Sequence, residues 1–306
     1  MKFRDIIMID FKGGIIMIYL KNFSLLEEVD ESNMITFKMN IHNNLYPLKI
    51  FPEKGFKYIE FEPITIFYGG NGSGKTTILN IISDSINASK RNIDKKGDLF
   101  NQYVELCKQH YELIHKDECK AIKYISSDDI FDYLLDLKAI NSNVNRRKAD
   151  LINEYYEYKN TNAERYSSSL NQYENLKNKV DSSRMTVSKY VRTRLRNNNI
   201  IQESNGETAL DFWQNEIEDN ALYIIDEPEN SLSAENQLKL KTFIEESTRF
   251  YNCQFIIATH SPFLLALRDA KIYDLDCVPV ESKKWTELEN VKVYNEFFKE
   301  HSDEFK

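Results

Sequence analysis

The chain of 306 residues contains few glycines, prolines and cysteines, and it has no apolar run that approaches the length of a membrane span. Its N-terminus mixes Lys2, Arg4 and Asp5 with apolar residues, which is not typical of a secretory signal. The four cysteines form no C-x-x-C pair, which favours reduced thiols in the cytosol and no zinc site. With 42% hydrophobic residues, the sequence predicts one large or two small cytoplasmic globular units that make no contact with a membrane.

Proline is absent between Pro63 and Pro228, and this long middle region reads as helical. The exception is the apolar run 121–125, which we expect to be a core strand. In the N-terminal region, residues 15–20, 35–41 and 58–61 are typical of strands and predict an antiparallel subdomain.

Four of the nine glycines fall within residues 69–74, directly before Lys75 and Thr76. This is the pattern G-x-x-x-x-G-K-[ST], in which backbone N–H groups and a helix N-terminus bind phosphates. Lys75 is expected to reach the phosphates and Thr76 to bind Mg²⁺. The strand-like run 64–68 precedes the loop, and helical spacing follows in 76–82. The predicted nucleotide-binding residues of this segment are Gly69, Gly70, Asn71, Gly72, Ser73, Gly74, Lys75, Thr76 and Thr77.

Two further buried strands end in residues suited to nucleotide chemistry. The run 221–225 leads to Asp226, the predicted Mg²⁺ carboxylate, and to Glu227, the predicted general base for water. The run 255–258 leads to His260, which we expect to contact the γ-phosphate. Lys75, Glu227 and His260 are therefore the predicted catalytic residues.

The order of loop, Asp-Glu strand and His strand resembles the ATP-binding-cassette (ABC) ATPase superfamily. That resemblance implies a signature ahead of the Asp-Glu strand, and Ser204-Asn205-Gly206-Glu207 stands there. It implies that Ser204 and Gly206 complete the ATP site of a second protomer, so that the partners are ATP and a second copy of the chain. This signature differs from that of the transporters and resembles that of the soluble branch, which includes SMC, RecF and OLD proteins.

The stretches 227–233, 260–264 and 270–276 resemble small bacterial AAA-annotated ATPases of the overcoming-lysogenisation (OLD) type. The tail after His260 is too short for the Toprim nuclease domain of full-length OLD proteins. The resemblance implies an α/β fold with an ABC-type P-loop core, an N-terminal antiparallel β-subdomain and a helical insertion before the signature. It implies ATP and Mg²⁺ as cofactors. The implied function is ATP hydrolysis coupled to a DNA transaction or a phage-defence effector; the alternative is an ATP-gated sensor that regulates a partner nuclease.

The insertion, at about 140–200, contains a heptad pattern and a basic segment. Tyr173, Val180 and Val187 recur every seven residues, which predicts a short helical hairpin. Basic residues outnumber acidic ones between Lys177 and Arg196 in a chain of net charge -8, which indicates a contact for nucleic acid or an acidic partner. A solvated helix face explains the same charges.

Two other segments also leave alternatives open. Asp128 or Asp129 stands where transporters carry a glutamine that senses Mg²⁺, and either could replace it or cap a helix beginning near Ile130. Residues 1–16 read either as a dispensable leader before Met17 or as an edge strand turned by Gly13 and Gly14. In the first interpretation the ATPase domain covers 17–306.

Overall fold

A computed structural model describes most of the chain and divides it into two compact units. One unit comprises Met1–Phe131 together with Asn205–Lys306, and the other is Asp132–Ser204. The second unit overlaps the insertion expected at 140–200. Among the described residues, no helix is both long and apolar enough to cross a membrane. The described residues are 8–9, 15–37, 45–92, 96–108, 110–160, 180–182, 190, 194, 205–230 and 232–305.

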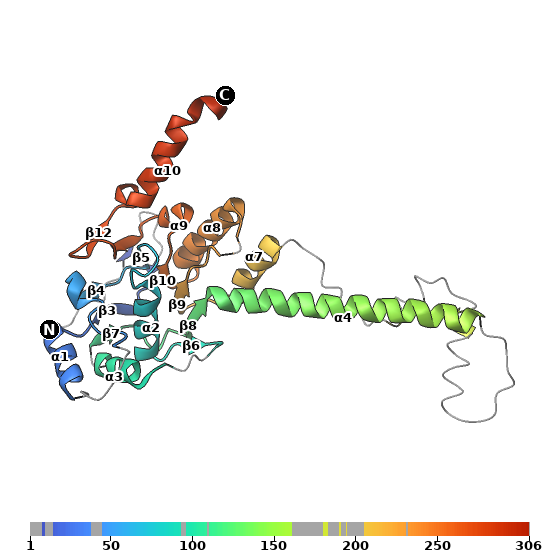
Figure 1. The fold of residues 1–306 in the computed structure, drawn as a ribbon, viewed down its shortest axis with the longest axis horizontal. Helices are drawn as coiled ribbons and strands as arrows, with labels where there is room; N and C mark the ends of the chain where they lie inside the picture. Colours follow the sequence, from blue (N-terminus) through green and yellow to red (C-terminus); the bar gives the residue numbers. More distant parts are fainter. Residues whose placement is uncertain are drawn as a thin grey trace. The chain divides into compact units, whose positions relative to one another are not determined.

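The first unit is built on a seven-stranded sheet with the order β12-β11-β5-β10-β9-β8-β6 (Figure 1). Every neighbouring pair is parallel except β11 and β12. The strands expected at 64–68, 121–125, 221–226 and 255–258 are all present, and the predicted α/β fold class is confirmed. The strands are β5 (Ile64–Tyr68), β6 (Ser89–Lys90), β8 (Ala121–Ser126), β9 (Ala221–Asp226), β10 (Gln254–Ala258), β11 (Lys271–Asp274) and β12 (Glu281–Lys283).

The central strands β5, β9 and β10 are buried along their whole length. A parallel strand with both faces buried needs a covering layer on each side, and it accordingly reads as a continuous apolar run. Helix α2 (Lys75–Ser85) packs on β9 and β10, and α8 (Ala234–Phe250) packs on β10 (Figure 1). Helix α3 (Asp98–Cys107) packs on α2. The core therefore holds the ends of β5, β9 and β10 rigidly in place.

The antiparallel subdomain is a three-stranded sheet of order β4-β3-β7, namely Tyr58–Glu60, Leu20–Ser24 and Tyr111–Leu113. The strand expected at 35–41 is wrong where it is described, because residues 35–37 end helix α1 (Glu28–Phe37), while 38–41 lie outside the described residues. Three acidic side chains in the first turn of α1 stabilise a helix N-terminus there. The third strand comes instead from after the glycine-rich loop.

The strand expected at 15–20 is interrupted. Strand β2 (Ile15–Ile16) pairs antiparallel with β1 (Met8–Ile9), and the next strand begins only at Leu20. This pair forms a separate two-stranded sheet, and Gly13 and Gly14, which the second interpretation of residues 1–16 places in the turn, lie outside the described residues. The buried backbone N–H groups of Tyr19 and Leu20 donate instead to the Gln254 side-chain oxygen, each at 2.8 Å.

The remaining helices flank this framework. Helix α4 (Ser127–Asn160) begins three residues before the start expected near Ile130. In the second unit, the Tyr155 ring of α4 lies 5.3 Å from the Tyr190 ring, centroid to centroid, and both side chains are buried. Tyr190 thus packs on α4, and the heptad positions Tyr173 and Val187 lie outside the described residues. The other helices are α7 (Asn205–Glu216), α9 (Pro262–Leu265), α10 (Glu289–Glu300) and the 3₁₀ turns Pro52–Lys54, Trp285–Glu287 and Ser302–Phe305.

Candidate nucleotide-binding site

The carboxyl ends of four parallel strands meet at one edge of the sheet. Ala258 of β10 stands in register with Phe67 of β5 and with Asp226 of β9, which in turn faces Ser126 of β8. Ligands of open parallel sheets bind beyond this edge, where the loops that follow the strands converge. The structure therefore brings together the glycine-rich loop, the Asp-Glu pair and the loop of His260.

The loop conformation explains its glycines. Gly72 and Gly74 have φ of 81° and 103°, in the left-handed region that side chains disfavour. A Cβ atom on Gly69 would lie 2.5 Å from Ser73 Oγ. Helix α2 begins directly after Gly74, and no side chain caps its N-terminus. The free N–H groups of its first turn are therefore available for an anion such as phosphate.

The ammonium group of Lys75 is enclosed by the loop. The side chain is only 5% exposed, and its Nζ donates to the carbonyl oxygens of Gly69 at 2.8 Å and Gly70 at 3.1 Å. The same Nζ lies 3.9 Å from Glu227 Oε1. A buried charge at the centre of the loop is well placed to attract phosphate oxygens.

Thr76 and Asp226, the two predicted Mg²⁺ ligands, are in contact. Burial raises the pKa of Asp226 to about 6, and a hydrogen bond with the Thr76 side chain opposes that rise. Among the described residues, neither Asp226 Oδ1 nor Ser73 Oγ of the glycine-rich loop has a hydrogen-bond partner, and both atoms are buried. Among the described residues, no group of three or more His, Cys, Asp or Glu could hold a metal alone. The pair suits Mg²⁺, which binds through one or two carboxylates together with substrate phosphates.

Glu227 lies at the mouth of the site. Its φ of 48° is left-handed, which turns the chain sharply after β9, and its N–H donates to the Ala258 carbonyl at 2.9 Å. The Glu227 side chain is 27% exposed, and its Oε2 accepts from Asn230 Nδ2 at 3.2 Å. The carboxylate is thus oriented and also open to water, as a general base requires.

Glu229 holds the loop that carries His260. Glu229 Oε1 accepts hydrogen bonds from the Thr259 hydroxyl at 2.7 Å and from the N–H groups of His260 at 3.0 Å and Ser261 at 3.2 Å. The Glu229 side chain is only 7% exposed and points inward. The His260 ring is 47% exposed, with Nδ1 3.8 Å from Glu227 Oε1.

Three supporting residues were not predicted from the sequence. Asp276 Oδ2 accepts from the N–H of Gly70 at 2.8 Å. Lys54 Nζ donates to the carbonyls of Ser73 at 2.7 Å and Leu275 at 2.6 Å. Asn290 Nδ2, at the start of α10, donates to the His260 carbonyl at 3.0 Å. Asp276 ended one of the stretches that carried the family resemblance, which was its only sequence signal, and Lys54 and Asn290 had none.

Four other predicted positions have different outcomes. Ser204 lies outside the described residues, whereas Gly206 is the second residue of α7. Asp129 accepts from the N–H and the hydroxyl of Ser126 and so caps the start of α4, as the helix-cap interpretation expects. Asp128 is exposed beside it.

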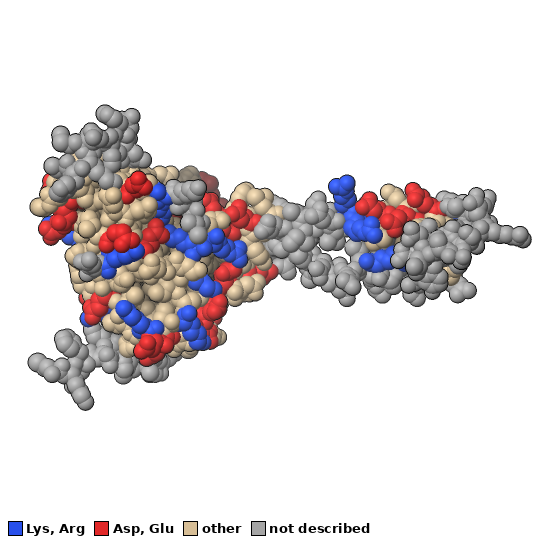
Figure 2. All heavy atoms as spheres, turned by 90° about the horizontal axis from the view of Figure 1, so that it is seen from below, with Lys and Arg blue, Asp and Glu red and all other residues tan. Residues whose placement is uncertain are grey.

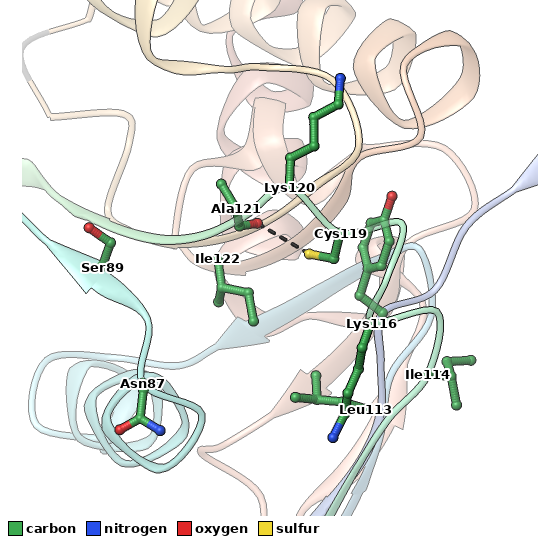
Figure 3. Close-up of a pocket in the computed structure, with 10 residues that line it drawn as sticks. Asn87, Ser89, Leu113, Ile114, Lys116, Cys119, Lys120, Ala121 and Ile122 are labelled. Atoms are coloured by element: carbon green, nitrogen blue, oxygen red, sulfur yellow. Dashed lines mark hydrogen bonds between the residues drawn. The ribbon is translucent and has the colours of Figure 1, made fainter.

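A separate cavity of 340 Å³ opens near the amino end of β8 (Figure 3). Its lining includes Tyr19, Leu113, Lys116 and Ile122, and no residue of the glycine-rich loop. In Figure 3 the Cys119 thiol approaches the Ala121 carbonyl, with a sulfur–oxygen distance of 3.3 Å. Strand β8 runs from this cavity toward Ser126, so the cavity lies at the opposite edge of the sheet from the candidate site.

Comparison with known proteins gives one family match. Residues 155–266 match the family model described as "AAA domain, putative AbiEii toxin, Type IV TA system". The match includes Asp226, Glu227 and His260 but stops short of the glycine-rich loop. No curated protein sequence matches the chain significantly.

Two solved structures that resemble the chain are distant from it in sequence. The SMC head domain from Thermotoga maritima is 15% identical, with 87% of this chain and 99% of that chain covered and a TM-score of 0.37. An inward-facing ABC transporter, of the metal-chelate type according to its description, is also 15% identical, with coverage of 76% and 78% and a TM-score of 0.34. Because these TM-scores are low, the fold assignment rests on the strand order and the loop. Together with the family match, that fold confirms the predicted resemblance to AAA-annotated ATPases with the ATP-binding-cassette fold.

Proposed function

We propose that the protein binds and hydrolyses ATP in the presence of Mg²⁺. The observation that carries this proposal is the contact between Thr76 and Asp226 beside a buried Lys75, with Glu227 only 3.9 Å from the Lys75 ammonium. A phosphate-binding cation, a metal-binding pair and an oriented carboxylate therefore share one site. These are the groups that phosphoryl transfer to water requires.

Each residue has a distinct role in this proposal. The N–H groups of the loop and Lys75 bind the β- and γ-phosphates, and Thr76 and Asp226 would hold Mg²⁺, which neutralises phosphate charge. Glu227 orients the attacking water and accepts its proton. His260, held by Glu229, contacts the γ-phosphate from the side of β10.

We extend the proposal to a dimer that closes around two ATP molecules. The support is the signature at Ser204 and Gly206 together with the open side of the site, where Asn71, Gly72 and the His260 ring are exposed. A helix N-terminus bearing Gly206 lets a backbone approach the partner's γ-phosphate closely. ATP binding would hold the dimer, and hydrolysis would release it.

The proposed output is control of an effector or of a nucleic-acid transaction in antiviral defence. The support is the resemblance to OLD-type ATPases and the matched family's description, which names a toxin of a toxin–antitoxin system. On the face drawn in Figure 2, the described basic and acidic side chains of the first unit are interspersed. Arg194 of the basic segment pairs with Asp181 at 2.8 Å, and most of that segment lies outside the described residues.

Equilibrium binding of Mg²⁺-ATP and steady-state hydrolysis test the proposal. Wild-type protein should bind ATP, and Lys75→Ala should lose at least about tenfold in affinity because an ion pair with phosphate is removed. Lys239→Ala is the matched control, since that lysine is exposed on α8 and pairs with Glu235. Turnover measured with and without DNA separates an enzyme from a sensor that barely hydrolyses ATP. Wild-type affinity in Lys75→Ala would refute the assignment of the loop.

A further inference from the structure

The hairpin next to the glycine-rich loop carries a compact cluster of Asp274, Cys277 and Lys283. Strands β11 and β12 pair antiparallel, with Asp274 opposite Glu281 and Ile272 opposite Lys283. Lys283 Nζ lies 2.8 Å from Asp274 Oδ2 and 2.7 Å from Cys277 Sγ. The thiol also lies 3.1 Å from Asp274 Oδ2. The three groups thus touch one another.

The nitrogen–sulfur separation is unusually short. It is below the mode of about 2.9 Å for N–H···O hydrogen bonds, although sulfur is a larger atom than oxygen. A gap of this size accommodates a single oxygen atom bonded to both sulfur and nitrogen. The Lys283 side chain is 27% exposed and Cys277 is partly exposed, so small oxidants can reach both.

Cys277 differs from the buried cysteines in its partial exposure and in its contact with a lysine. The hydrogen bond with Asp274 raises the pKa of Lys283, so this lysine is charged at rest. Cys107 and Cys253, by contrast, are buried, and burial raises the pKa of each thiol to about 12.

We propose that Cys277 and Lys283 form a reversible S–O–N crosslink when dioxygen is present. The thiol S–H and one amine N–H bond break, and S–O and O–N bonds form. Thiol and amine together lose four electrons to dioxygen. One oxygen atom stays in the bridge, and the other leaves as water with the two hydrogens, while the extra ammonium proton goes to solvent.

The crosslink has a direct route to the glycine-rich loop. Asp274 Oδ1 accepts from the N–H of Asp276 at 3.1 Å, and Asp276 accepts from Gly70. Conversion of the Lys283 ammonium into a neutral bridge removes its charge-assisted bond to Asp274. Asp274 then positions Asp276 less firmly, and the hydrogen bond from the Gly70 N–H to Asp276 weakens. This step rests on the proposed function, and it predicts weaker ATP binding by the crosslinked protein.

Peptide mass spectrometry tests the crosslink without any need for activity. Air-exposed protein, digested with trypsin, should yield a peptide covering 272–284. This peptide should be about 14 Da heavier than the unmodified peptide 272–284, because it gains one oxygen and loses two hydrogens. Dithiothreitol should reverse the change. Cys277→Ser and Lys283→Arg should abolish it, whereas Lys284→Arg and Cys119→Ser should keep the bridge. An unmodified Cys277, or a sulfenic or sulfinic acid with Lys283 still cleavable, would overturn the proposal.

ATP affinity, measured on the crosslinked protein and on the protein reduced with dithiothreitol, tests whether the crosslink weakens ATP binding. The crosslinked form should bind ATP several-fold more weakly than the reduced form, and Lys283→Arg should show no such redox dependence. Equal affinities in a fully crosslinked sample would overturn the route through Asp276. A failure of both samples to bind ATP, with the mass change present, would count against the proposed function and leave the crosslink established.

Discussion

The backbone N–H of His260 donates a hydrogen bond to the buried carboxylate of Glu229, 3.0 Å away. The same carboxylate oxygen accepts from the residues on both sides of His260, so one side chain fixes the whole turn after β10. The position of the His260 ring therefore depends on a residue that follows a different strand, β9. This link joins the two strand ends on which the proposed hydrolysis depends.

Glu229→Ala should destabilise the protein and lower its turnover. The Thr259 hydroxyl and the His260 N–H lose their acceptor, whereas the Ser261 N–H keeps Thr259 Oγ1 at 3.0 Å. Buried donors without partners cost about 1–3 kcal/mol each, so a loss of about 2–6 kcal/mol is expected. Urea unfolding measures the loss. Glu229→Gln should retain most of the stability because its side-chain oxygen still accepts.

The control for this prediction is Glu235→Ala, which removes an exposed carboxylate on α8 that pairs with Lys239. Its effect should stay within about 0.5 kcal/mol. If Glu229→Ala is no more destabilising than this control, the turn does not depend on Glu229.

Gly69→Ala should abolish ATP binding, whereas Gly97→Ala should not change it. A Cβ atom at residue 69 would lie 2.5 Å from Ser73 Oγ and 3.1 Å from Asp276 Oδ1, so the loop must shift. No atom of the described residues lies within 4 Å of a Cβ atom at residue 97. Equilibrium titration with ATP measures both variants, and circular dichroism verifies that both fold. Wild-type affinity in a folded Gly69→Ala would contradict the loop geometry.

The core strands were predictable because β5, β9 and β10 are continuous apolar runs that end in distinctive residues. The glycine-rich loop was predictable because its spacing is fixed by phosphate geometry. The strand expected at 35–41 was wrong over its described residues, 35–37, because β-branched and aromatic residues suggested a strand while the acidic first turn of α1 favoured a helix. The inward turn of Glu229 could not be predicted, since it depends on hydrogen bonds to residues about 30 positions away.

Asp226→Asn should stabilise the protein at pH 7.5 when no nucleotide is bound. The folded-state pKa is raised from 3.8 to about 6, chiefly by burial, so ionising Asp226 costs stability as the pH rises through that interval. Two pKa units correspond to about 3 kcal/mol, an upper limit for the gain at pH 7.5. Below pH 4 the wild type is also neutral at this position, so the gain should vanish.

Thermal melts of both proteins at pH 4 and pH 7.5 give the comparison. Addition of Mg²⁺-ATP at pH 7.5 should raise the Tm of the wild type and not that of Asp226→Asn, because a bound ligand stabilises only the form that binds it. If Asp226→Asn is no more stable than the wild type at pH 7.5, or is more stable by the same amount at pH 4 and pH 7.5, then ionisation of Asp226 does not destabilise the fold.

Complementation between variants tests the dimer. Lys75→Ala and Gly206→Trp should each lack ATPase activity as homodimers, the first because it cannot hold phosphate and the second because it blocks the partner's site. A mixture should regain activity, since each heterodimer contains one intact composite site. Native mass spectrometry verifies that heterodimers form. Their formation without any regained activity would contradict the shared site.

The most direct measurement of the central claim is single-turnover hydrolysis by Glu227→Gln beside the wild type. The amide keeps the shape of the side chain but cannot accept a proton from water, so ATP affinity should be retained while the rate falls at least about a hundredfold. Bound ATP should then accumulate and hold the dimer. Hydrolysis by Glu227→Gln at the wild-type rate would contradict the account.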